Sequence, residues 1–135
     1  MKPCTCIISF VCLLGLAGCS STSLPSEARS VALVRESSNA VALNVPEFAM
    51  ADGRLTLNGS LYRQADAETT TKSHIDIVFL DAAGRVLRSE VASFAPRDLR
   101  LLPRQKARGY YSVSITDWPA GTASIRVRAH ETEHT

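Results

Sequence analysis

Residues 74–94 read HIDIVFLDAAGRVLRSEVASF, and this stretch decides the fold. In its first half every second side chain is strongly apolar, namely Ile75, Ile77 and Phe79. A period of two places successive side chains on opposite faces of a β-strand. We therefore expect a strand that buries these three residues and turns His74 and Asp76 outward as solvated strand residues.

The second half of the stretch predicts a hairpin. In Asp81-Ala82-Ala83-Gly84 the aspartate can bond its own backbone and the glycine tolerates a positive φ, so a tight turn leads into a second strand over 85–94. Leu87 and Val91 are expected to point inward on that strand.

The same alternation recurs on both sides of this hairpin. Gly59 interrupts one run and marks a bulge or a close approach of two backbones, and Pro46 ends another. The residues expected inside are Val41, Leu43 and Val45, then Leu55, Leu57 and Leu61, then Tyr111, Val113 and Ile115, and finally Ala123, Ile125, Val127 and Ala129. Six or seven strands without helices predict an all-β fold over residues 31–130, an antiparallel immunoglobulin-like or fibronectin-like β-sandwich.

The segment Phe79-Leu80-Asp81-Ala82-Ala83-Gly84-Arg85-Val86-Leu87 resembles small exported bacterial sandwiches of the FxLYD type, in which a strand enters an Asp-x-x-Gly turn. Leu80 stands where that family prefers tyrosine. The resemblance covers Leu55 to Ala129 and implies an accessory or binding module. It implies no catalytic residues.

The first residues have the pattern of a secretory leader. Lys2 precedes an apolar run from Ile7 to Leu16, which is about half the length of a membrane-spanning helix. We expect residues 1–18 to be a signal peptide that is removed. Three of the four cysteines lie within it, so only Cys19 is expected in the mature chain.

Leu16-Ala17-Gly18-Cys19 resembles the lipobox of bacterial lipoproteins. The resemblance implies cleavage before Cys19 and lipid on its thiol, with several acyl chains anchoring the protein firmly to a membrane. Ser20, in place of an aspartate, favours the outer membrane, facing the periplasm, over the inner membrane. Residues 19–30 are expected to form a lipidated polar tether, and residues 131–135 a frayed tail.

The charge balance argues against nucleic acid as a partner. Lys and Arg number 15 and Asp and Glu 13, so no general attraction to phosphate backbones is expected. The positive charge is concentrated in one connection, at Arg97, Arg100, Arg104, Lys106 and Arg108. Arginine forks suit anionic groups, which leaves two interpretations: a site for an anionic envelope glycan or lipid, or a solvated loop pinned to the sandwich by Leu99, Leu101 and Leu102.

Few residues suit catalysis or metal binding, and neither an enzyme nor a cofactor is expected. His74 and Asp76 are a possible catalytic dyad, and His130 and His134 a possible metal pair, although solvated strand and tail residues explain both pairs. Trp118, with Tyr110 and Tyr111, lines either a stacking surface for sugars or peptides or ordinary core packing.

Three functions remain open. The first is a non-enzymatic, membrane-tethered binding module that holds another envelope protein, or an anionic envelope glycan or lipid, through a sheet edge or loop. The second is a structural subunit of an envelope or secretion assembly. The third is a metal-binding or hydrolytic envelope protein that uses His74 and Asp76 or His130 and His134.

Overall fold

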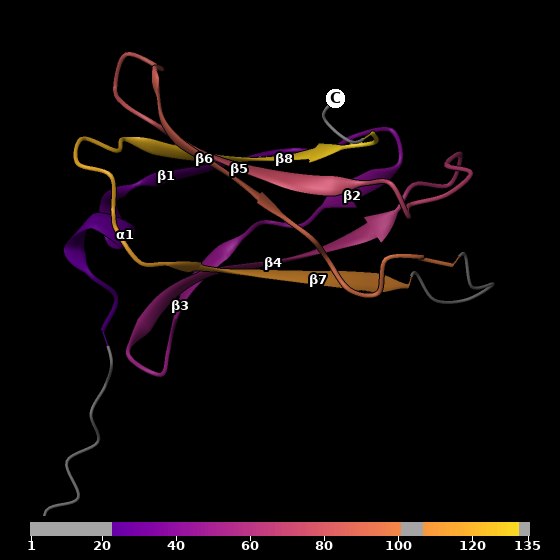
Figure 1. Cartoon of the computed structure of the whole chain (residues 1–135), viewed down its shortest axis with the longest axis horizontal. Helices are drawn as coiled ribbons and strands as arrows, with labels where there is room; N and C mark the ends of the chain where they lie inside the picture. Colours follow the sequence, from indigo (N-terminus) through magenta and orange to yellow (C-terminus); the bar gives the residue numbers. More distant parts are fainter. Residues whose placement is uncertain (1–22, 101–106, 133–135) are drawn as a thin grey trace, which may run out of the picture.

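The protein is a sandwich of two β-sheets (Figure 1). The computed structural model describes residues 23–100 and 107–132, and these ranges contain eight strands rather than the six or seven expected. The predicted all-β, largely antiparallel fold is confirmed. The elements are α1 (Ser26–Ser30), β1 (Ala32–Glu36), β2 (Val41–Leu43), β3 (Glu47–Ala51), β4 (Arg54–Arg63), β5 (His74–Leu80), β6 (Val86–Ala92), β7 (Arg108–Ile115) and β8 (Ser124–His130).

The two sheets differ in how their strands are arranged. In the first sheet the order is β1-β8-β5-β6, and β1 pairs with β8 in parallel. In the second sheet β4 pairs with β7 along most of its length, and its other edge takes β2 and then β3. All these pairs except β1 with β8 are antiparallel.

The core lies between the sheets, and the alternation predicts most of it. The residues with the least exposed side chains include Leu57, Leu61, Ile75, Ile77, Phe79, Ile125 and Val127, all at 0%. Ala123 differs, because it lies in the connection before β8 and is exposed.

The predicted inward position of Leu87 and Val91 is wrong, because these side chains are 39% and 64% exposed. Residues 75–79 pair with 92–88 in one regular register, so Arg88 lies opposite Phe79 and Val91 opposite Asp76; the register shifts only after Phe79, where Leu80 pairs with Val86. The Arg88 guanidinium covers the Phe79 ring at 4.6 Å and pairs with Glu90 at 2.8 Å. Charged side chains on the inner side of an edge strand discourage pairing with another chain.

Val45 also differs from expectation. It follows β2 rather than belonging to it, and it is 69% exposed. The Asn44 backbone N–H donates to the Ser60 carbonyl, and Pro46 then leads into β3. All three residues of β2 are buried, so alternation does not extend through this segment.

A short helix lies within the segment expected to be a polar tether. In α1 the Arg29 N–H donates to the Pro25 carbonyl, and Ala28 packs in the core at 5% exposure. The side chains of Leu24 and Val31 pack against the same core. The chain therefore joins the sandwich before residue 31. The part of the chain that the structure describes contains no helix with the length and apolar character needed to cross a bilayer.

Gly59 allows the close approach that the sequence predicts. It lies opposite Tyr111 in the pairing of β4 with β7. A Cβ at this position would lie 2.1 Å from Tyr111 Oη and 2.2 Å from Tyr111 Cζ. The Tyr111 ring thus occupies the space that any other residue at position 59 would need.

Burial also raises the pKa of Tyr111, from 10.0 to about 12. The unfolded chain therefore releases this proton first, and the free energy of unfolding should fall between about pH 10 and 12, by up to about 1.4 kcal/mol per pH unit. Urea unfolding across this range checks the prediction. Tyr111→Phe should lack this component, and an identical alkaline loss in that variant would show that another group is responsible.

Candidate functional site

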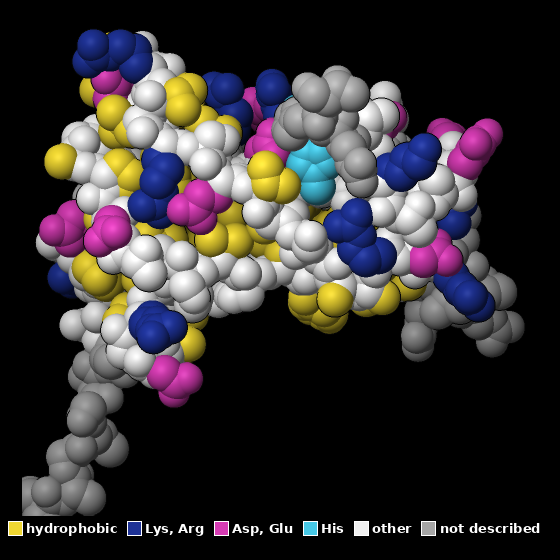
Figure 2. Space-filling model, in the orientation of Figure 1, with side chains coloured by type: hydrophobic (Ala, Val, Ile, Leu, Met, Phe, Trp, Pro, Cys, Tyr) yellow, Lys and Arg dark blue, Asp and Glu magenta, His cyan; other side chains and the backbone are white. Residues whose placement is uncertain are grey.

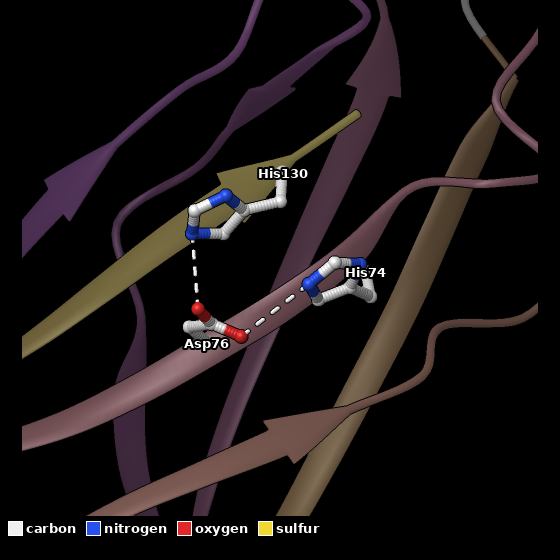
Figure 3. Close-up of side chains that lie close together, drawn as sticks. All are labelled: His74, Asp76 and His130. Carbon is white, nitrogen blue, oxygen red and sulfur yellow. Dashed lines mark ion pairs between the residues drawn. The ribbon is translucent and has the colours of Figure 1, made fainter. Parts of the chain in front are cut away.

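Three side chains from two strands meet on one face of the first sheet (Figure 3). His74 begins β5 and lies directly opposite His130, which ends β8. Asp76 is two residues further along β5, so it shares the face of His74. One potential ligand atom from each of the three residues lies within 4.8 Å of the others.

The carboxylate of Asp76 lies between the two imidazoles. Its Oδ2 is 2.9 Å from His130 Nε2, and its Oδ1 is 3.5 Å from His74 Nε2. The two rings stack nearly parallel, with centroids 5.2 Å apart and an angle of 8° between their planes. Both imidazoles thus direct the same nitrogen toward one carboxyl group.

The expectation that His74 and Asp76 are solvated is wrong, because they are only 7% and 9% exposed. They lie on a central strand, with β8 on one side and β6 on the other. Val91 of β6 lies opposite Asp76 and flanks it on the side away from β8. The site keeps an opening at His130, whose side chain is 27% exposed, and Figure 2 shows part of a histidine side chain at the surface.

An arginine lies opposite the site in the pairing of β5 with β8, but its guanidinium binds a carboxylate on a different strand. Arg128 lies opposite Asp76 in the pairing of β5 with β8. Its Nε, however, donates to Glu36 on β1, and Glu36 also pairs with Arg126 at 3.2 Å. Glu36 therefore engages two guanidinium groups on the side of β8 that faces away from Asp76.

The predicted pairing of His130 with His134 stays a prediction, because only His130 of the two is described. The structure brings His130 to His74 and Asp76, and His134 lies outside the described residues. The sequence contained one usable signal: His74 and His130 stand at opposite ends of two strands, and an antiparallel pair brings such positions together.

The five basic residues of the 97–108 stretch divide into different environments. Arg97 fastens the connection, since its Nη2 donates to the Thr71 carbonyl at 2.6 Å and its guanidinium lies 5.5 Å from the Phe94 ring centroid. Leu99 is fully buried, as the pinned-loop interpretation requires. Arg100 and Arg108 are exposed. The remaining members of the predicted set, Arg104, Lys106, Leu101 and Leu102, lie outside the described residues.

The aromatic residues do not form one platform. Trp118 packs against Phe79 edge-on and against Phe48 at a tilt, with centroids 6.0 Å apart in both contacts. Tyr111 is buried, whereas Tyr110 is 60% exposed. Tyr110 lines an open surface groove of about 410 Å³, which sequence reasoning missed, together with Val45, Glu47, Asn58, Ser60 and Ser112.

Of these features, only the His74, Asp76 and His130 cluster converges on one point. Two imidazole nitrogens and a carboxylate can share protons or supply three ligands to a cation. The carboxylate contacts both imidazoles, which is not the order of nucleophile, base and orienting acid found in hydrolytic triads. No protein-family model, curated protein or solved structure matches the chain.

Proposed function

We propose that the chain is a lipid-anchored protein of the bacterial envelope and acts as a non-enzymatic binding module. It is cut before Cys19, carries lipid on that residue, and faces the periplasm from the outer membrane. The leader and the Leu16 to Cys19 lipobox support this proposal, although they lie outside the described residues.

The observation that carries the proposal is the position of α1 relative to the loops. Figure 1 places α1 beside the turn between β3 and β4 and beside the connection from β7 to β8, at one end of the sandwich. The connections over 64–73 and 93–100 lie at the other end. β4 spans the two ends and has 10 residues, which corresponds to about 34 Å of strand.

The spacer between Cys19 and the folded domain is short. Leu24 already packs against the core, and five residues reach at most about 18 Å. With lipid on Cys19, the α1 end is therefore held close to the membrane surface, and the opposite end projects away from it. The opposite end is the one suited to meeting another envelope component.

The projecting end offers exposed and mostly polar side chains. Arg100 is exposed there, and Arg63 and Arg97 are engaged in fastening the two connections. An envelope protein, or an anionic envelope glycan or lipid, is a suitable partner for such a surface, since an arginine guanidinium pairs well with carboxylate and phosphate groups.

Photocrosslinking in intact cells tests the anchor and the surface together. A photoreactive residue in place of Arg100 should give a covalent adduct with an envelope component, recovered with the membrane fraction. Cys19→Ser should abolish both lipid attachment and membrane recovery, because the thiol is the acceptor of the lipid. Mass spectrometry of the product identifies the new amino terminus and its modification.

A matched position at the α1 end provides the control. Ala120 is exposed in the connection between β7 and β8, and the same photoreactive residue there should not capture that component. Capture from position 120 alone, or from neither position, would contradict the proposed surface. A product that keeps residues 1–18, or an unmodified Cys19, would contradict the anchor.

A further inference from the structure

We infer that His74, Asp76 and His130 form a binding site for one divalent transition-metal ion of the Zn²⁺ class. The cluster is built across two paired strands, so the backbone ladder between β5 and β8 fixes the spacing of its members. A site of this kind does not depend on the fold of a loop or of a terminal segment.

The distances suit a small ion with nitrogen and oxygen ligands. Bonds of about 2.1 Å in a tetrahedral site place neighbouring ligand atoms about 3.4 Å apart. The two distances from the Asp76 oxygens, 2.9 and 3.5 Å, lie on either side of this value. Because all the ligand atoms lie within 4.8 Å of one another, rotations of the side chains can bring them to one centre without moving the strands.

The donor set selects the class of ion. Two imidazoles favour Zn²⁺ and its neighbours in the first transition row, whereas Ca²⁺ and Mg²⁺ prefer oxygen ligands alone. One carboxylate offsets half of the ion's charge. Glu36 adds to this effect from outside the site, since it engages the guanidinium of Arg128 on the side away from Asp76.

Three protein ligands leave one coordination position for water or for a group from a partner. The exposure of the His130 side chain, 27%, provides the approach to that position, whereas the side chains of His74 and Asp76 are 8% and 13% exposed. Open sites of this composition are typical of exchangeable or reactive metal centres rather than closed structural ones.

Titration of the full-length protein in mild detergent with Zn²⁺ tests the inference, at a pH of about 7.5, where imidazole is mostly neutral. The wild type should bind one ion per chain. Loss of a partner outside the coordination sphere costs about 10- to 100-fold in affinity, so His74→Gln, which removes a direct ligand, should cost more than about 100-fold. Calorimetry against a competing chelator measures both affinities.

Two variants outside the donor set sharpen the test. His134→Gln is the matched control, because it removes an imidazole that the inference does not use, and it should leave the affinity unchanged. Glu36→Gln keeps all three ligands but releases Arg128 toward Asp76, and should weaken Zn²⁺ binding about tenfold.

Three results would overturn the inference: no Zn²⁺ binding by the wild type, equal affinity in His74→Gln, or binding that is lost in His134→Gln and kept in His74→Gln. The first would leave the cluster as an ion-pair and hydrogen-bond fastening between β5 and β8. If His74→Gln fails to fold, the wild type loaded with Co²⁺ still decides, since a four-coordinate Co²⁺ centre absorbs visible light far more strongly than six-coordinate aqueous Co²⁺. Absence of this absorption would overturn the inference.

Discussion

Gly59→Ala is expected to lower the free energy of unfolding by about 3 to 5 kcal/mol, the range found when a large aromatic side chain is lost from a core. The added Cβ would lie 2.1 Å from Tyr111 Oη and 2.2 Å from Cζ, and such overlap cannot be relieved by a few tenths of an ångström. The ring must leave the core, where Tyr111 is 3% exposed. Urea unfolding of the two proteins measures the difference.

The Tyr111→Leu background isolates the steric cause. Without the ring, the three atoms nearest to a Cβ at position 59 are gone, and the better fit of alanine to an extended backbone should make Gly59→Ala neutral or stabilising by up to about 1 kcal/mol. The effect of one substitution therefore changes sign with the residue opposite it. An equal loss in both backgrounds would show that Gly59 is needed for its backbone conformation rather than for the ring.

Thr70→Val is expected to lower the free energy of unfolding by about 2 to 4 kcal/mol with almost no change in side-chain shape. The Thr70 hydroxyl donates to the Arg97 carbonyl at 2.7 Å and accepts from the Leu99 N–H at 2.9 Å. Both Thr70 and Leu99 are fully buried. Valine would leave two backbone groups without this partner, and each such loss costs about 1 to 3 kcal/mol when the group is buried.

Thr71→Val is the matched control, because Thr71 is exposed one residue later, and exposed substitutions usually change stability by less than about 0.5 kcal/mol. Amide hydrogen exchange gives a local measurement: the Leu99 N–H should exchange much faster in Thr70→Val and at the wild-type rate in Thr71→Val. Unchanged protection of Leu99 would mean that the hydroxyl does not hold the 93–100 connection.

The strand pattern of this chain predicts its core better than its edges. Alternation identifies Ile75, Ile77 and Phe79 because a strand that separates core from exterior must alternate. It fails for Leu87 and Val91, because the pairing of β6 with β5 puts Arg88, Glu90 and Ala92 opposite the buried side of β5. The apolar pattern of 85–94 does not fix that register, and a register that differs by one residue reverses the faces of a strand.

β3 and α1 were also not expected from the sequence, which contains a signal for β3 only. Asp52 and Gly53 both have positive φ, 50° and 72°, and join β3 to β4. An Asp-Gly pair between two strands is a strong hairpin signal, so β3 was predictable. α1 was not, because five residues with one buried alanine show no helical period.

The candidate site depends on information that a single sequence does not hold. His74 and His130 are 56 positions apart, and only the pairing of β5 with β8 makes them neighbours. Their burial follows from the central place of β5 in its sheet, and strand order is set by the topology as a whole. Residue spacing favoured His130 with His134 for the same reason: it detects only local neighbours.

The parallel pairing of β1 with β8 determines how the domain carries mechanical load. The two strands align from Ala32 opposite Ser124 to Glu36 opposite Arg128. A pull between the α1 end and the far end of β8 makes these strands slide along each other, so their hydrogen bonds are strained together instead of opening one after another. Shear of this kind withstands more force than unzipping, so the pairing of β1 with β8 resists a pull applied between these two ends of the domain.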